Sequence, residues 1–156
     1  MIDYGKFAFY NTKYGILKIG YLNKKITLIK FSTQDEYCDK NRNELSNKAY
    51  KEIMEYFEGK RKTFYLPLLL MGTEFQKKVW NALSNIPYGE TRSYKQIAIE
   101  IGNDKASRAI GMANNKNPII IVIPCHRVIG INGKLVGYGG GLDRKETFLN
   151  IESKKK

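Results

Sequence analysis

The chain has 156 residues, of which 42% are hydrophobic and 27% charged, so it can build one ordinary domain or two small ones without metals or disulfides. Its 27 lysines and arginines exceed its 15 aspartates and glutamates, and the formal net charge of +12 favours a polyanionic partner, either nucleic acid or an anionic membrane surface. The apolar runs are too short to cross a bilayer and no secretory signal opens the chain, so we expect a cytoplasmic, intracellular protein with no membrane partner.

Residues 1–72 predict a small β-sheet with one helix. Three short runs are rich in aromatic and β-branched residues and are separated by turn residues. These runs are Phe7–Tyr10, Ile16–Tyr21 and Ile26–Phe31. Apolar residues then recur at intervals of three and four over Glu44–Glu58, which predicts an amphipathic helix that ends at Gly59. We place a domain boundary at Gly72, which makes residues 1–72 an N-terminal α/β domain.

Residues 73–152 predict a mostly helical second domain, followed by a basic tail at residues 153–156. Two sequences fit the capping box that opens a helix: Thr73 with Gln76, and Ser93 with Gln96. The second of these helices runs to about Ile101, a turn containing glycine follows, and another helix covers about Lys105 to Lys116. Two short helices joined in this way predict a helix-turn-helix, although a plain helical hairpin fits the same pattern.

The surface of this helix pair favours DNA. It carries basic residues that could contact phosphates, and the second helix is slim enough to approach a groove closely, although slimness also serves close helix packing. The basic residues are Arg92, Lys95, Lys105, Arg108 and Lys116, and the small residues of the second helix are Ala109, Gly111 and Ala113.

The candidate catalytic residues lie in the C-terminal part of the chain. Ile119–Ile123 is β-branched almost throughout and predicts a buried strand that ends at Pro124, directly before Cys125 and His126. The glycine-rich segment 136–141 predicts irregular backbone, and Leu142–Ile151 predicts a last helix.

Cys125 is the candidate nucleophile. A thiol attacks as its thiolate, and a neighbouring imidazole favours that form, so the single histidine of the chain directly after Cys125 is informative. The alternative is a buried structural cysteine beside a hydrogen-bonded histidine. The other cysteine, Cys38, lies among charged residues without a histidine nearby. Two cysteines and one histidine are too few for a structural zinc site, so we expect no metal and no cofactor.

Several segments taken together resemble the O6-alkylguanine-DNA alkyltransferases. The resemblance runs from about Thr73 to Glu152, and residues 1–72 match only loosely. The matching segments are Phe75-Gln76, Val79-Trp80, Ile86-Pro87-Tyr88-Gly89-Glu90, Ser93-Tyr94, Asn117-Pro118, Pro124-Cys125-His126-Arg127-Val128 and Gly137-Tyr138-Gly139-Gly140-Gly141-Leu142. The resemblance implies an α+β fold, with a small ribonuclease-H-like domain of sheet and helix before a winged-helix-like domain that contains the helix-turn-helix.

The resemblance also assigns catalytic roles. Cys125 would accept the alkyl group, and His126, oriented by Glu152, would act through a bridging water as the base for the thiol. Asn117 would brace the turn between the second helix of the pair and the active-site strand. Tyr94 would crowd the phosphate that rotates the nucleotide and would donate a proton toward the departing guanine.

The remaining implied residues bind DNA or the displaced base. Arg108 would fill the gap that the flipped nucleotide leaves in the base stack, with the second helix in the minor groove. The other implied DNA contacts are Ser93, Ala109, Asn114 and Arg127. The implied base pocket consists of Pro124, Val128, Tyr138, Gly139 and Gly140.

The implied function is DNA repair by direct reversal, in a monomer whose partner is double-stranded DNA that contains O6-alkylguanine. The alkyl group moves irreversibly to Cys125, so each molecule reacts once; the sequence leaves O4-alkylthymine open as a second substrate.

Three other interpretations are a non-catalytic alkyltransferase-like lesion binder, a helix-turn-helix regulator that uses Cys125 as a sensor, and a cysteine hydrolase. The lesion binders replace the reactive cysteine and lack the N-terminal domain, whereas this chain has both.

Overall fold

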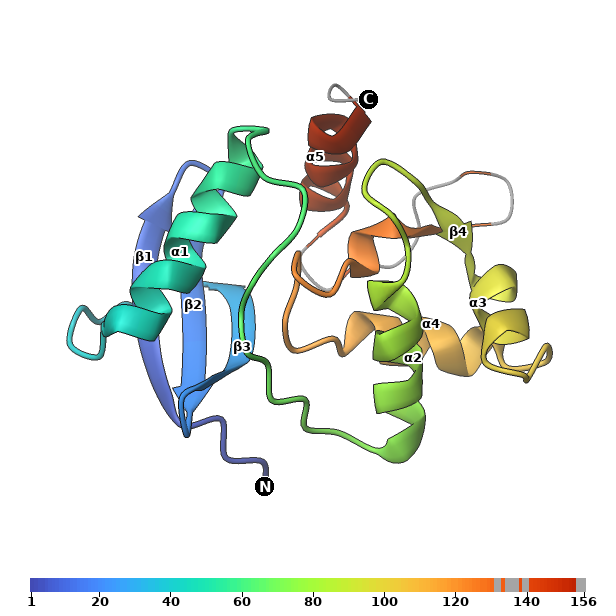
Figure 1. The fold of residues 1–156 in the computed structure, drawn as a ribbon, viewed down its shortest axis with the longest axis horizontal. Coiled ribbons are helices and arrows are strands. Elements are labelled where there is room, and N and C mark those ends of the chain that lie inside the picture. Colours follow the sequence, from blue (N-terminus) through green and yellow to red (C-terminus); the bar gives the residue numbers. More distant parts are fainter. Residues whose placement is uncertain (131–132, 134–137, 139–140, 154–156) are drawn as a thin grey trace. The chain divides into compact units, whose positions relative to one another are not determined.

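The computed structural model describes residues 1–130, 133, 138 and 141–153, and it divides into two compact units, Met1–Met71 and Gly72–Lys156. The first unit is a small sheet with a helix, and the second is mostly helical (Figure 1). This arrangement confirms the fold class expected from the sequence. Among the described residues, no helix has the length and apolar character needed to span a membrane.

The first unit is a three-stranded antiparallel sheet in the order β1-β2-β3, formed by β1 (Lys6–Thr12), β2 (Gly15–Leu22) and β3 (Lys25–Ser32). Asn23 and Lys24 both have positive φ angles, as a two-residue hairpin turn between twisted strands requires. Helix α1 (Glu44–Phe57) lies across one face of the sheet (Figure 1), and its buried residues include Ile53 and Tyr56.

The second unit begins with three helices: α2 (Glu74–Ser84), α3 (Tyr94–Glu100) and α4 (Ser107–Asn115). The predicted capping boxes of Thr73 with Gln76 and of Ser93 with Gln96 are both present. Trp80 on α2 is buried, and its indole Nε1 donates a hydrogen bond of 2.9 Å to the carbonyl of Ala113, which ties α2 to α4.

Helices α3 and α4 lie side by side and form the predicted helix pair (Figure 1). Gly102 follows the end of α3 with φ +81°, a conformation that glycine adopts without strain, and the chain turns there toward α4. Gly111 on α4 faces Tyr94, because a Cβ atom at Gly111 would lie 3.8 Å from the tyrosine ring. This is an ordinary van der Waals distance, so the space between the two helices at this point would also admit an alanine.

The strand predicted over Ile119–Ile123 is wrong. The four isoleucines are buried as expected and Val122 is partly buried, but the backbone turns on itself, with hydrogen bonds from Val122 N to Ile120 O (2.8 Å) and from Ile123 N to Ile119 O (3.0 Å). Ile121 has φ +73°, a left-handed conformation that is unfavourable for a β-branched residue. The β-branched residues here indicate burial but not a strand, because the hydrogen bonds of the turn determine the backbone conformation.

The turn leads into a short 3-10 helix, η1 (Cys125–Arg127), which places three chemically active residues in succession. The two-residue strand β5 (Val128–Ile129) follows and pairs in parallel with β4 (Arg92–Ser93) at the start of α3. The described chain ends with α5 (Leu142–Ser153), whose inner side faces η1.

Candidate active site

Two asparagines hold the segment that carries Cys125. The Asn117 amide donates a hydrogen bond of 2.7 Å to Ile123 O and accepts one of 3.0 Å from Ile119 N, so it closes the turn before η1. The Asn114 amide, at the end of α4, donates a longer bond of 3.3 Å to the carbonyl of Cys125. The segment that carries the thiol is therefore held both by the end of the second helix of the pair and by the turn that follows it.

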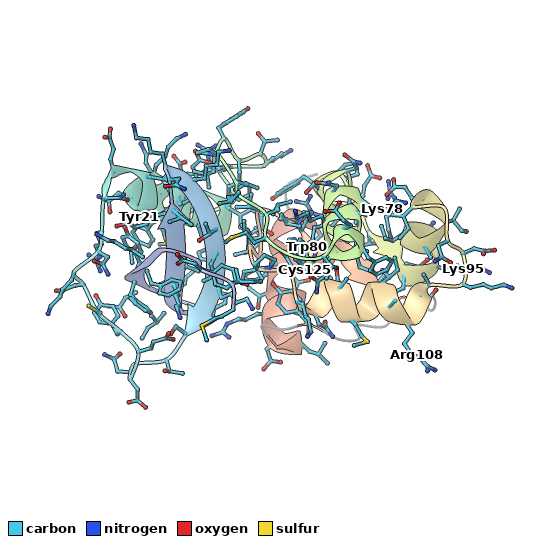
Figure 2. The ribbon with its side chains drawn as sticks, turned by 90° about the horizontal axis from the view of Figure 1, so that it is seen from below. Tyr21, Lys78, Trp80, Lys95, Arg108 and Cys125 are labelled. Carbon is cyan, nitrogen blue, oxygen red and sulfur yellow. The ribbon has the colours of Figure 1, made fainter. Side chains whose placement is uncertain are left out.

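The Cys125 side chain is only 2% exposed, and Figure 2 shows it inside the second unit. Burial raises the pKa of this thiol to about 11, against the opposing effects of a hydrogen bond from Asn117, the charge of Lys145 and the hydroxyl of Tyr138. Formation of the thiolate at neutral pH therefore requires groups that remove the proton and stabilise the charge.

His126 and Arg127 both contact Glu152 of α5. Nε2 of His126 lies 2.6 Å from Oε2 of Glu152, and Arg127 donates bonds of 2.8 and 3.0 Å to the two carboxylate oxygens. A third donor, the backbone N–H of Gly89, binds Oε1 at 3.1 Å. Burial alone would raise the pKa of Glu152, but the bond with His126 and the charge of Arg127 outweigh burial and lower this pKa to about 2.

The same site keeps His126 neutral. Burial lowers the pKa of its imidazole, and the charges of Arg127 and Lys145 act in the same direction, whereas Glu152 opposes them. A neutral imidazole can accept a proton, so this environment suits a base.

Two tyrosines lie near the thiol from other elements. Tyr94, the first residue of α3, is partly buried, and burial and the neighbouring Cys125 raise its pKa. Tyr138 is buried, and burial together with Cys125 raises its pKa well above the usual value. Both phenols stay protonated at neutral pH and can donate hydrogen bonds near the sulfur.

The outer side of the helix pair is polar and basic. Arg108 and Ala109 are exposed at the start of α4, and Figure 2 shows Arg108 and Lys95 pointing outward from the unit. The Ser93 hydroxyl caps α3 by accepting a bond of 3.1 Å from Gln96 N. Pro124 and Val128 are buried on either side of η1.

Two of the predicted DNA contacts point into the protein. The Arg127 guanidinium is bound to Glu152 and donates a bond of 2.7 Å to Ile86 O. Asn114 is 1% exposed and bonded to the carbonyl of Cys125. The sequence shows that these side chains are polar, but it does not show whether they point outward or into the protein. Gly139 and Gly140, predicted in the base pocket, lie outside the described residues, as does most of segment 136–141.

Sequence reasoning missed Lys145. The buried residues of α5 are Lys145, Phe148 and Glu152, at intervals of three and four, so they form one face of the helix. The Phe148 ring packs edge-on against His126, with ring centroids 5.7 Å apart. The spacing from Glu152 could have pointed to Lys145, but a lysine in a polar helix is normally taken as a surface residue.

This arrangement is suited to nucleophilic chemistry at the thiol. It contains one buried thiol, a neutral imidazole aligned by a carboxylate, two protonated phenols and one buried ammonium group. No group of three or more potential metal ligands occurs in the part of the chain that the structure describes.

Comparison with known proteins finds two family models that together cover most of the chain. Residues 74–154 match the 6-O-methylguanine DNA methyltransferase, DNA binding domain, and residues 4–70 match the 6-O-methylguanine DNA methyltransferase, ribonuclease-like domain. These matches support the two-part organisation as well as the family resemblance of the C-terminal part.

Curated relatives and solved structures agree. The chain is 60% identical over 109 residues to the methylated-DNA–protein-cysteine methyltransferase of Methanosarcina acetivorans, an alignment that covers 70% of each protein. The corresponding protein of Mycolicibacterium paratuberculosis is 59% identical over 104 residues, which span 67% of this chain but 63% of that relative. The fold matches Mycobacterium tuberculosis O6-methylguanine methyltransferase with a TM-score of 0.86 and 39% identity, over 96% of this chain and 93% of the other. A structure of the M. tuberculosis protein in complex with DNA matches equally well.

Proposed function

Because the chain belongs to the 6-O-methylguanine DNA methyltransferase family, we propose that it repairs DNA by transferring an alkyl group from O6 of guanine to its own Cys125. The observation that carries the assignment of the acceptor is the position of Cys125. It is a buried thiol directly before His126, which is aligned by Glu152, and it follows the helix pair after the turn that Asn117 closes.

The reaction balances without a cofactor. The sulfur of Cys125 forms a bond to the alkyl carbon, the bond from that carbon to O6 breaks, and its electron pair remains on the guanine. The thiol proton leaves Cys125, one proton is returned to the guanine, and the products are unmodified guanine and an S-alkylcysteine. A thioether resists hydrolysis, so each protein molecule reacts once.

Different residues around the thiol carry out the individual proton transfers. His126 takes up the thiol proton through a bridging water, and Glu152 fixes the imidazole and stabilises its charge. Tyr94 and Tyr138 are protonated near the sulfur, and Tyr94 donates toward the departing guanine. Asn117 keeps the thiol in place during the transfer. Positioning of the reacting groups supplies much of the acceleration in such a displacement.

The target guanine has to leave the duplex, because Cys125 is buried and a paired base cannot reach it. In this proposal α4 enters the minor groove, and Ala109 permits close approach. Arg108 occupies the space that the base leaves, and Ser93 contacts the backbone at the start of α3. Pro124, Val128, Tyr138, Gly139 and Gly140 enclose the flipped base. We further propose that the protein acts as a monomer in the cytoplasm with access to chromosomal DNA.

The decisive test is intact-mass spectrometry after mixing the protein with a duplex that contains one O6-methylguanine, beside an undamaged duplex. We expect one methyl group per protein molecule in place of a hydrogen, located by peptide mapping on Cys125. Cys125→Ala keeps lesion binding and gains no mass. An unchanged mass with intact lesion binding would instead identify a non-catalytic damage binder, and methylation of Cys125→Ala would refute the assignment of the acceptor.

A further inference from the structure

Lys145 is fully buried, which is exceptional for a lysine. It lies on α5 one turn before Phe148 and two turns before Glu152, on the face that packs against η1. Its side chain therefore approaches the active site from the same helix that supplies the carboxylate bound to His126.

The charges near Lys145 come from several elements. Lys145 interacts electrostatically with Cys125 and His126 of η1, and Cys125 also interacts with Tyr94 of α3 and with Tyr138. Glu152 is bound to His126 and Arg127, at the other end of the α5 face. Lys145 and Cys125 interact electrostatically, because each favours the charged form of the other.

We propose that Lys145 is the electrostatic partner of the Cys125 thiolate, and that its ammonium group balances the charge that the sulfur carries before it attacks the alkyl carbon. The inference deepens the proposed alkyl transfer and rests on it. The same positive charge disfavours protonation of His126, so Lys145 favours both the thiolate and a base that is ready to accept the thiol proton.

The burial of Lys145 has a cost that is consistent with a functional role. Burial lowers the pKa of Lys145 to about 8, with Cys125 acting against the shift, so the ammonium form persists at neutral pH although burial disfavours it. An apolar side chain of similar length would avoid this desolvation and often leaves a protein as stable or more stable.

The test compares Lys145→Met with Lys145→Arg, and uses Lys78→Met as the matched control because Lys78 is exposed on α2 of the same unit. In a Cys38→Ser background, the pH dependence of iodoacetamide alkylation reports the pKa of the Cys125 thiol without any DNA. Single-turnover transfer from an O6-methylguanine duplex and thermal unfolding are measured in parallel.

We expect Lys145→Met to raise the thiol pKa and to slow transfer at pH 7.5 by on the order of 10- to 1,000-fold, the range that an opposite charge nearby supplies. Its unfolding temperature stays equal to or above that of the starting protein. Lys145→Arg keeps most of the transfer rate and of the lowered thiol pKa, and Lys78→Met matches the starting protein.

An unchanged thiol pH profile in Lys145→Met overturns the inference, as does a loss of stability that parallels the loss of transfer, because the lysine would then be structural. Failure of the parent protein to transfer methyl at all would instead refute the proposed function, and the iodoacetamide titration would still decide the role of Lys145.

Discussion

Nε2 of His126 and Oε2 of Glu152 are 2.6 Å apart, and both side chains are excluded from solvent. This contact joins the first turn after the candidate nucleophile to the last helix of the described chain. Because Arg127 and the N–H of Gly89 bind the same carboxylate, Glu152 connects three separate segments of the second unit. We therefore expect both the alignment of His126 and the stability of this unit to depend on Glu152.

The first prediction follows from that dependence. Glu152→Gln removes the charge opposite Arg127 and leaves a buried guanidinium without its carboxylate, so we expect a loss of about 3–5 kcal/mol in the free energy of unfolding. We also expect single-turnover transfer to slow, because the imidazole loses its orienting anion. Denaturant unfolding and transfer kinetics measure the two effects. The control is Glu146→Gln, which changes an exposed residue of the same helix and leaves both nearly unaltered. Equal stability of the two variants would contradict the structural role of Glu152.

The second prediction concerns acid stability. Glu152 has its pKa lowered to about 2 in the folded protein from an ordinary value of 4.5, so its stabilising contribution is complete above about pH 4.5 and is lost as the pH falls toward 2. The pKa of His126 is also lowered from 6.5, so stability that depends on the neutral imidazole declines below about pH 6.5. Unfolding monitored between pH 7 and pH 3 is therefore expected to show falling stability, with a shallower fall in Glu152→Gln. An identical slope in the variant would contradict this prediction.

Much of the fold could be predicted because its signals are local. The capping boxes at Thr73 and Ser93, the hairpin residues Asn23 and Lys24, and the apolar spacing of α1 depend on a few neighbouring residues. Cys125 and His126 were identified from thiol chemistry and their adjacency, Glu152 was found through the family resemblance, and the structure brings His126 and Glu152 into contact. Their catalytic roles stay predictions.

What the sequence did not predict depends on which partners the side chains find in the fold, both near and far along the chain. The buried turn over Ile119–Ile123 requires the side chain of Asn117, whose two hydrogen bonds replace those of a strand. The inward orientation of Arg127 requires Glu152, which lies 25 residues further along the chain. Lys145 looked like a surface residue because its burial appears only when α5 packs against η1.

The third prediction ranks the two asparagines that hold the thiol. Asn117→Ala removes the acceptor of the buried Ile119 N–H and leaves Ile123 O with only the bond from Cys125 N, and an unsatisfied buried group costs about 1–3 kcal/mol. Asn114→Ala removes one longer bond, to the carbonyl of Cys125. We expect Asn117→Ala to lower the unfolding free energy more than Asn114→Ala and to slow transfer more, as measured by chemical denaturation and single-turnover kinetics. The reverse order would show that the end of α4, and not the turn, fixes the position of the thiol.

The fourth prediction separates the two outward-pointing cations of the helix pair (Figure 2). Arg108 projects from the start of α4, and we expect Arg108→Ala to weaken binding to a duplex with O6-methylguanine more than binding to an undamaged duplex, because its proposed role is to replace the flipped base. Lys95 projects from α3, and Lys95→Ala is expected to weaken both equally and to reduce the slope of log K against log salt by about 1, as a phosphate contact does. Binding is measured by fluorescence anisotropy in the Cys125→Ala background, so that no transfer occurs. Equal losses on both duplexes for Arg108→Ala would make Arg108 a phosphate contact as well, and nucleotide displacement would then have to depend on Tyr94.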